Sequence, residues 1–372
     1  EVAGFRAFKQ LRIERLGRVN LVVGKNSIGK SCLLEAIRLY AEQGSLQVLL
    51  QLLSARDEDT EPVRRYIISD SDNEISPFLQ VQHLFYGRKN LEQINHPIEI
   101  GSLRTNRNKL RINLGVVDEN RESDGPRALR PFHAASQPSL FEDEYIDAIP
   151  GLSITFGRET EQVFPLIRER FYRPRLDTRI NLNRTRSIFV SSQGLSMSDV
   201  DRYWDQIKLR DSKKKVLSAL QIIASEIEDV DIFGVVERTR DRVVKVRIHE
   251  MGEPLPLRSM GDGLNRVFGL TVALVNASDG ILLVDEIESG LHYSVQRDLW
   301  RLIFQTARQL NVQVFATTHS WDCIESFQKA AIEDENTEGM LIRLQRKGDE
   351  IVPTLFDEQR LTIVSQEQIE VR

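Results

Sequence analysis

Apolar and polar positions change their spacing along the chain, and each change indicates a different kind of element. Val2–Leu16 alternates loosely between apolar and charged residues, and Val19–Val23 is a compact apolar run. After a glycine-rich turn, apolar residues recur at helical spacing at Leu33, Leu34, Ile37 and Tyr40. This order predicts two early strands, then a turn, then a helix.

The middle of the chain has a different pattern. Pro97–Ile100, Leu110–Val117 and Leu152–Phe156 predict short strands separated by polar turns, as in an antiparallel subdomain. Helical spacing returns after Met197. Two successive helices are expected from two apolar series, Val200, Tyr203, Trp204 and Ile207, then Val216, Leu217, Leu220, Ile223 and Ile227. We interpret these helices as an inserted helical lobe.

The last third of the chain alternates strands and helices. We expect a hairpin over Phe233–Val236 and Arg242–His249, a helix over Ser259–Asn276, a strand over Ile281–Val284, a helix over Ser294–Leu310 and a strand over Val312–Ala316. Such alternation is typical of α/β folds. The sequence therefore predicts an α/β protein with an antiparallel β subdomain and an inserted helical lobe, divided into residues 1–157, 158–230 and 231–372.

Composition changes this picture little. The 372 residues, 41% of them hydrophobic, suffice for one substantial α/β domain and a second lobe. A formal net charge of -5 with 28% charged residues describes an ordinary globular surface. Overall charge therefore selects no partner, and any affinity for nucleic acid must come from a local patch.

The cysteines and the apolar runs bear on the cellular location. Cys32 and Cys323 lack the spacing of a zinc site or of a disulfide framework, which favours a reducing cytoplasm. No apolar run approaches the roughly 20 residues of a membrane-spanning helix. The first residues also lack the features of a secretory signal, so we expect a cytoplasmic protein without membrane contact.

The glycine-rich turn carries the first candidate chemistry. Gly24–Ser31 is a full match to the phosphate-loop pattern and lies between an expected strand and an expected helix. Glycines let successive backbone N–H groups face phosphates, and the helix N-terminus adds its positive dipole. We expect Lys30 to reach the β- and γ-phosphates and Ser31 to supply an oxygen to Mg²⁺. The expected ATP-binding residues are Gly24, Asn26, Ser27, Gly29, Lys30, Ser31 and Cys32.

Two carboxylates follow an expected buried strand. Asp285 and Glu286 come directly after Ile281–Val284, at the strand end where ligand sites of α/β folds lie. Asp285 is placed to help hold Mg²⁺, and Glu286 to polarise the water that attacks the γ-phosphorus. Without the phosphate loop, a core strand that ends in a solvated acidic turn explains the run equally well.

Polar side chains also follow the next expected strand. Thr317, Thr318 and His319 end the run that starts at Val314, so His319 is a candidate to hydrogen-bond the γ-phosphate or the attacking water. A lone histidine is usually structural, but its place after a strand favours a functional role. The candidate catalytic residues are therefore Lys30, Glu286 and His319.

A second phosphate site is predicted at Ser259–Gly263, which precedes an expected amphipathic helix. The Ser259 hydroxyl, backbone N–H groups and the helix dipole would face an anion there, with Gly261 and Gly263 as further binding residues. Without context, these residues form an ordinary N-cap and turn. Because one chain does not need two such sites for one nucleotide, we interpret this segment as serving a neighbouring subunit's ATP.

The four motifs, in this order, resemble the ABC-type ATPase heads, and within them the RecF, SMC and OLD (overcoming lysogenization defect) group. Phe5–Lys9 with Leu16–Asn26 looks like the opening of stand-alone OLD-like ATPases. Asp285–His292 looks like their Walker B motif and D-loop. The resemblance covers about residues 1–50 and 255–325, and it implies a P-loop NTPase fold of the ABC type with ATP and Mg²⁺ as cofactors.

The resemblance also implies an assembly. In a head-to-tail dimer or higher homo-oligomer, the phosphate loop of one subunit and Ser259–Gly263 of the other would enclose ATP. Ser259 and Gly261 would touch the γ-phosphate, although this segment departs from the family's Leu-Ser-Gly-Gly-Gln sequence. Gln80 or Gln82 is a candidate Q-loop residue, with a polar position beside a strand as the alternative.

The function expected by analogy involves a second protein. Many OLD relatives carry a C-terminal Toprim nuclease domain, and the roughly fifty residues that follow Ser320 are too few for one. We therefore expect an ATPase head that acts on a separately encoded effector, a Toprim or other nuclease, in phage defence. A RecF- or SMC-like DNA-repair ATPase is the nearest alternative, and a scaffold or sensor that turns over little ATP is the alternative from another class.

An arginine-rich segment is the candidate contact to DNA or RNA. Its arginines are interleaved with Phe164, Phe171 and Tyr172, which could stack bases while the guanidinium groups track a phosphate backbone. Nearby acidic residues make a solvated helix with salt bridges an equal alternative. The arginines are Arg158, Arg168, Arg170, Arg173, Arg175, Arg179, Arg184 and Arg186.

Overall fold

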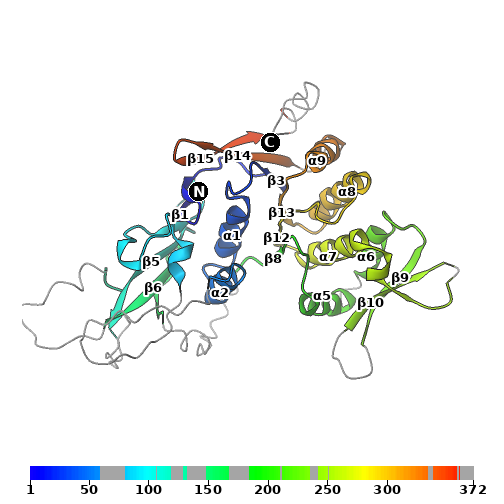
Figure 1. Ribbon diagram of the computed structural model, residues 1–372, viewed down its shortest axis with the longest axis horizontal. Helices are drawn as coiled ribbons and strands as arrows, with labels where there is room; N and C mark the ends of the chain where they lie inside the picture. The colour runs from blue at the N-terminus through cyan, green and yellow to red at the C-terminus, as the bar shows by residue number, and fades with distance from the viewer. Residues whose placement is uncertain are drawn as a thin grey trace, which may run out of the picture. The chain divides into compact units, whose positions relative to one another are not determined.

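The computed structural model describes residues 1–58, 80–105, 107–118, 129–131, 148–166, 184–209, 212–234, 242–249, 251–333, 338–357 and 360. The chain forms two compact units, and most of their elements are labelled in Figure 1. Unit 1 comprises Glu1–Glu14, Glu35–Arg184 and Arg346–Val352, and unit 2 comprises Arg15–Leu34, Thr185–Gln345 and Pro353–Arg372. The two units are defined by which residues pack together, and each contains several separate parts of the chain. The predicted domains are three consecutive ranges divided at residues 157 and 230, and this division stays a prediction.

Unit 1 is built on a six-stranded sheet with the order β2-β1-β4-β5-β6-β7. Each neighbouring pair is antiparallel, which confirms the predicted antiparallel subdomain. Three early strands form instead of two, because the chain reverses at Arg6, where φ is +46°. The elements are β1 Val2–Phe5, β2 Phe8–Leu11, β4 Ile98–Ile100, β5 Leu110–Asp118, β6 Ala148–Phe156, β7 Gln162–Pro165, α2 Leu46–Ser54, η1 Val81–Leu84 and η2 Leu91–Gln93.

Unit 2 contains most of a second six-stranded sheet, which has the order β15-β14-β3-β13-β12-β8. The five strands from β14 to β8 run parallel, as expected of a strand–helix–strand alternation. Its strands are β3 Val19–Val23, β8 Ser187–Val190, β12 Ile281–Val284, β13 Gln313–Thr317, β14 Gly339–Lys347 and β15 Glu350–Phe356. The sequence pattern missed β8, β14 and β15, although Ile188–Val190 and Met340–Leu344 are largely apolar runs.

The register of the parallel strands brings distant segments to one edge. Thr317 of β13 lies opposite Val22 of β3, and β13 also pairs in parallel with β12. The phosphate loop and Asp285 follow β3 and β12 directly, and His319 comes two residues after β13 ends. They therefore share the carboxyl edge of the sheet, which is where α/β proteins bind ligands.

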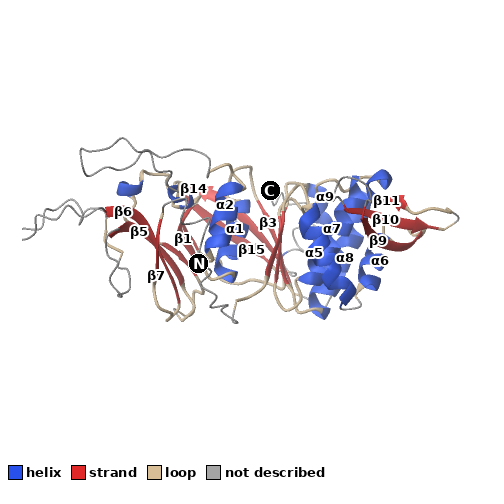
Figure 2. Ribbon diagram, turned by 90° about the horizontal axis from the view of Figure 1, so that it is seen from below, coloured by secondary structure: helices blue, strands red, loops and turns tan. Residues whose placement is uncertain are grey.

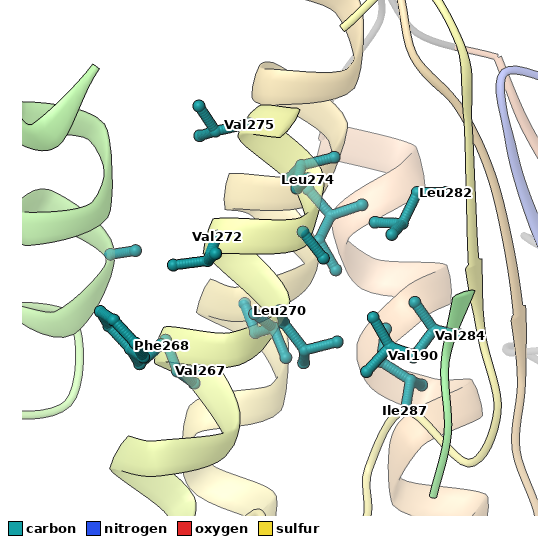
Figure 3. Packing of buried hydrophobic residues seen from close by; sticks show 14 of the residues in the cluster. Val190, Val267, Phe268, Leu270, Val272, Leu274, Val275, Leu282, Val284 and Ile287 are labelled. Atoms are coloured by element: carbon teal, nitrogen blue, oxygen red, sulfur yellow. The ribbon is translucent and has the colours of Figure 1, made fainter. Parts of the chain in front are cut away.

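Helices bury one large apolar cluster in unit 2. Between Leu264 and Asn276 of α7, every residue except Asn265 is buried. Figure 3 shows Phe268 on the side of α7 away from Leu282 of β12, so this helix is covered on two sides. These helices are α5 Met197–Leu209, α6 Lys213–Leu220, α7 Asp262–Asn276, α8 Tyr293–Gln309 and α9 Trp321–Glu333. A further helix, α1 Lys30–Ala41, contributes no residue to this cluster. None of the helices in the described part of the chain is long and apolar enough to cross a membrane.

Two expected helices differ from those observed. α6 ends at Leu220, so Ile223 lies in a turn and Ile227 begins a strand. The helix expected over Ser259–Asn276 is divided at Gly261, whose φ of +109° is incompatible with a helix. A three-stranded antiparallel sheet contacts α6, as Figure 2 shows. Its strands are β9 Ile227–Gly234, β10 Arg242–Ile248 and β11 Leu255–Pro256, and η3 Leu257–Met260 follows.

Candidate functional site

The phosphate loop connects β3 to α1 through three residues with positive φ. Gly24, Ser27 and Gly29 have φ values of +144°, +60° and +100°. A Cβ atom at Gly24 would lie 2.6 Å from the carbonyl oxygen of Leu344, so only glycine fits there. The loop therefore has the tight curl and the helix start that the sequence predicts.

Lys30 is the first residue of α1, and its side chain folds back over the loop. Only 5% of the residue is exposed, and Nζ donates hydrogen bonds to the carbonyl oxygens of Gly24 at 2.7 Å and Lys25 at 3.1 Å. Burial lowers the pKa of Lys30, while the charges of Asp285 and Glu286 oppose this effect. The ammonium group is thus held next to the loop by backbone oxygens and nearby carboxylates.

Ser31 and Asp285 are in direct contact. The Ser31 hydroxyl lies 3.1 Å from Oδ1 and 2.9 Å from Oδ2 of Asp285. Thr317 Oγ1 donates to Asp285 Oδ1 at 2.5 Å. One carboxylate therefore joins the start of α1, the residue after β12 and the last residue of β13.

Glu286 and His319 also lie close to each other. Nε2 of His319 is 3.7 Å from Oε1 of Glu286, and Nδ1 of His319 is 3.3 Å from Nζ of Lys30. An ammonium group can only donate, so we assign the acceptor role to Nδ1 and the ring proton to Nε2. The side chains of His319 and Glu286 are 38% and 44% exposed, which leaves both accessible to a ligand or water.

Arg266 and Glu288 belong to the same site and were missed in the sequence. Arg266 donates to the carbonyl oxygens of Ser191 at 2.7 Å and of Asp285 and Glu286 at 3.0 Å. Burial lowers the pKa of Arg266, and the charge of Glu288 opposes this most strongly. Oε1 of Glu288 accepts the backbone N–H of His319 at 2.9 Å. The signal in the sequence was an arginine among the apolar residues of α7, because an arginine at such a position is seldom buried without a partner.

Ser259–Gly263, here called the signature segment, is arranged differently. The Ser259 hydroxyl is exposed and donates to the carbonyl oxygen of Pro256 at 2.6 Å. A Cβ atom at Gly261 would meet nothing within 4 Å, whereas one at Gly263 would lie 3.2 Å from the carbonyl oxygen of Gly290. Ser259 and Gly261 therefore face open space in the described chain, and Gly263 packs against the segment that follows Glu288.

Gln80, a candidate Q-loop residue, lies in unit 1. It is 7% exposed, and its side-chain oxygen accepts hydrogen bonds from Gln82 at 2.8 Å and from the His83 ring at 3.0 Å. The side chain is therefore engaged locally. A Q-loop role for Gln80 or Gln82 stays a prediction.

The arginine-rich segment can be followed only in part. Arg168, Arg170, Arg173, Arg175 and Arg179 lie outside the described residues. Arg186 is described, and it donates to the side chain of Gln206 at 2.5 Å. Whether the segment contacts nucleic acid stays a prediction.

The sequence of most of the chain matches a known protein family. The family described as "AAA domain, putative AbiEii toxin, Type IV TA system" matches residues 19–322. The chain belongs to this AAA-domain family. It is a nucleotide-binding ATPase, and its phosphate loop, signature segment and both carboxylates fall within the matched region. The predicted α/β fold class of a P-loop ATPase with an antiparallel β subdomain is confirmed, whereas the ABC type and the inserted helical lobe stay predictions.

Individual proteins are similar to this AAA-domain protein at lower identity. A Helicobacter pylori protein named "ATP/GTP phosphatase" is 21% identical over 376 residues, which cover 95% of this chain and 94% of that protein. An uncharacterized protein of Methanocaldococcus jannaschii is 29% identical over 96 residues, which cover 26% of this chain and 83% of that protein. The first similarity extends over nearly the full length of both chains.

Solved structures of SMC heads also align with the chain. An Smc head bound to the C-winged helix domain of ScpA is 12% identical, with a TM-score of 0.46 and coverage of 97% of this chain and 98% of that one. The SMC head domain of Thermotoga maritima is 14% identical, with a TM-score of 0.39 and coverage of 95% and 97%. These similarities are too low to identify a partner or a function.

Proposed function

We propose that the chain binds Mg²⁺ and ATP at the phosphate loop and hydrolyses the β–γ phosphoanhydride with Glu286 as general base. The observation that supports this most is the contact of the Ser31 hydroxyl with both carboxylate oxygens of Asp285. It joins the first turn of α1 to the end of β12 across 254 residues of sequence. P-loop ATPases hold Mg²⁺ with a loop hydroxyl and with an aspartate that follows a strand. The Ser31 hydroxyl and the Asp285 carboxylate are the corresponding groups in this chain.

The residues present suit a magnesium ion. Mg²⁺ prefers oxygen ligands and is usually held by one or two carboxylates together with phosphates and water. Ser31 supplies a hydroxyl and Asp285 a carboxylate, side by side. In the described part of the chain, no cluster of three or more His, Cys, Asp or Glu offers a rival metal site. Ser31 and Asp285 would hold the ion, which when bound would neutralise charge on the phosphates.

The buried ammonium group of Lys30 supports anion binding. Its present partners include the carbonyl oxygens of Gly24 and Lys25, which are neutral. Phosphate oxygens carry charge and form shorter and stronger hydrogen bonds with an ammonium group. We infer that Lys30 exchanges these loop contacts for the β- and γ-phosphates when ATP binds.

Glu286 and His319 would share the chemistry at the γ-phosphate. Glu286 would accept a proton from the attacking water, and its partial exposure lets water reach it. The Nε2–H of His319 faces the same space and would donate a hydrogen bond to the γ-phosphate or to the water. Water adds to the γ-phosphorus, the bond to the β-phosphate oxygen breaks, and ADP and phosphate leave.

A second copy of the chain would complete the site. The exposed Ser259 hydroxyl and the open surroundings of Gly261 support a contact with a ligand outside their own subunit. In a two-fold dimer each signature segment would cover the ATP on the other subunit's phosphate loop. Gly263 would contribute by close packing against Gly290 rather than by touching phosphate.

We further propose that nucleotide state controls contact with a separately encoded effector, such as a nuclease, in phage defence. This proposal rests on the resemblance to OLD-like ATPases. The family description, which names a putative toxin of a type IV TA system, is consistent with it. Proteins that co-purify with the chain in ATP but not in ADP would identify the effector, and DNA-repair proteins among them would favour the RecF- or SMC-like alternative.

Lys30→Ala tests the nucleotide site. We expect ATP affinity to fall by about 10- to 100-fold by calorimetry, because a charge-assisted contact is lost. Lys329→Ala is a matched control, since Lys329 is an exposed lysine paired with Glu325 on α9. Unchanged affinity in Lys30→Ala would refute the phosphate-loop assignment. A wild-type phosphate-release rate no higher than that of Lys30→Ala would instead favour an ATP-dependent scaffold.

A further inference from the structure

The Thr317 side chain lies between the two acidic residues that follow β12. Its Oγ1 donates to Oδ1 of Asp285 at 2.5 Å and accepts the backbone N–H of Glu286 at 2.9 Å. Thr317 is the last residue of β13 and is fully buried. A hydroxyl has one proton to donate, so donation to Asp285 leaves its lone pairs free to accept from Glu286. One hydroxyl group therefore links both residues.

The backbone that Thr317 contacts is in an uncommon conformation. Glu286 has a φ of +47°, in the left-handed region that residues other than glycine seldom adopt. Such a conformation persists only where surrounding contacts hold it. Thr317 supplies a second contact through its carbonyl oxygen, which accepts the N–H of Ile287 at 3.0 Å. From the other side, Arg266 donates to the carbonyl oxygens of Asp285 and Glu286.

We propose that Thr317 is a positioning residue for ATP hydrolysis, an inference that rests on the roles proposed for Asp285 and Glu286. Its hydroxyl keeps the Asp285 carboxylate turned towards Ser31 and keeps the Glu286 backbone in the conformation that aims the base. Without the hydroxyl, the Asp285 carboxylate can rotate and the Glu286 N–H loses its partner. The chemical step should then slow, while ATP binding, which depends on the loop, should change little.

Thr318 offers a matched control one residue later. It is 1% exposed, and its hydroxyl accepts the backbone N–H of Ser320 at 3.0 Å. No described hydrogen bond joins this hydroxyl to Asp285 or Glu286. Thr318→Val therefore removes a buried hydroxyl of the same kind without touching the acidic residues.

The test compares kcat and KM of Thr317→Val, Thr317→Ser and Thr318→Val. We expect Thr317→Val to lower kcat by about 10- to 100-fold, because contacts to a charged group and to a buried N–H are lost. The KM of Thr317→Val for ATP should stay within about threefold of wild type. Thr317→Ser keeps the hydroxyl, so both its kcat and its KM should stay within about threefold of wild type. Thr318→Val should also stay within about threefold in kcat. Thermal unfolding of each variant reports whether the fold is intact.

Two outcomes would overturn the proposal. One is a kcat for Thr317→Val no lower than that of Thr318→Val, and the other is an equal loss in the serine and valine variants. If valine prevents folding, Thr317→Ala replaces it, because alanine and serine differ only in the hydroxyl group. An equal kcat for alanine and serine would then be decisive against the proposal.

Glu286→Gln, measured alongside, separates this inference from the proposed function. Turnover at the wild-type rate in Glu286→Gln would overturn the role of the base and, with it, the role of Thr317. An inactive Glu286→Gln together with a fully active Thr317→Val would leave the proposed function standing and would reject the positioning role alone.

Discussion

The phosphate-loop cluster, which comprises Lys30, Ser31, Asp285, Glu286 and His319, differs from the signature segment in how its side chains are engaged. Ser31 and Lys30 bind partners within the cluster or in the loop, and the carboxylate of Asp285 accepts from two hydroxyl groups. Ser259 instead bonds to the backbone of its own turn, and Gly261 faces open space. Both regions lie in unit 2.

This difference shows which half of the proposed site a single chain can form. A ligand at the phosphate-loop cluster meets groups already oriented by hydrogen bonds, so little conformational freedom is lost when it binds. A ligand at the signature segment would find an exposed hydroxyl and accessible backbone without such an arrangement. We therefore expect one subunit to suffice for nucleotide binding and two subunits to be needed for efficient turnover.

The largest expected effect concerns the base of the phosphate-loop cluster. Glu286→Gln should lower phosphate release by about 100- to 10,000-fold, since an amide cannot accept the proton from water. ATP binding, measured by calorimetry, should persist because Lys30 and Ser31 remain. Glu325→Gln, an exposed acidic residue on α9 paired with Lys329, is the control and should hydrolyse ATP at the wild-type rate. Hydrolysis that survives in Glu286→Gln would show that this carboxylate is not the base.

A mixing experiment tests whether the two regions meet across subunits. Lys30→Ala blocks a phosphate loop, and Ser259→Arg places a bulky charge on an exposed signature segment. Each variant alone should be nearly inactive. Because about half of the dimers in an equal mixture are mixed and each of these has one intact site, about one quarter of wild-type activity should return. If the mixture is no more active than either variant alone, the signature segment does not act on ATP bound to the other subunit. It would then act on ATP of its own subunit or take no part in hydrolysis.

A milder change at the signature segment should separate turnover from binding. Ser259→Ala removes one hydroxyl contact to a charged phosphate, so we expect kcat to fall by about tenfold. The affinity of the single chain for ATP should remain as in wild type, because the loop is intact. Equal weakening of binding and turnover would contradict the division of labour between the two regions. Ser294→Ala, at the start of α8, is a suitable control for a hydroxyl on an exposed turn.

The smallest effect concerns pH. Burial lowers the pKa of Lys30 below its ordinary value of 10.5, whereas bound phosphates favour the ammonium form and raise it. At pH values between the pKa of Lys30 without ATP and its pKa with ATP bound, Lys30 takes up a proton when ATP binds. Affinity should therefore fall as pH rises through this alkaline window, by at most about tenfold per pH unit. Lys30→Arg keeps its charge there, and a parallel decline in that variant would assign the effect to another group.

The sequence predicted much of the phosphate-loop cluster because each of its motifs lies within one short segment of the chain. The strand, loop and helix around Gly24–Ser31 depend on glycines and on apolar spacing within a short segment. The carboxylates after Ile281–Val284 follow the general rule for strand ends in α/β folds. The predicted strands over Ile281–Val284 and Val312–Ala316 were confirmed within one residue.

The missed features depend on contacts between distant segments. Thr317 looked like one of several polar residues after a strand, and only the register of β13 beside β12 brings it to Asp285. Arg266 lies in a helix whose other buried residues fit an ordinary core pattern. The break at Gly261 was hidden because apolar spacing continues on both sides, although a glycine with positive φ ends regular helix geometry.

The place of β3 at the centre of its sheet bears on how the protein is synthesised. β3 is synthesised well before its two neighbours, β13 and β14, and the Asn20 side chain bonds to the Val314 carbonyl across 294 residues. At typical translation rates of about 5 to 20 residues per second, the strand before the phosphate loop waits roughly 15 to 60 s for these partners. A nascent chain should therefore acquire its capacity for ATP only after β13 and β14 have been synthesised, and fragments released before that point should not bind nucleotide.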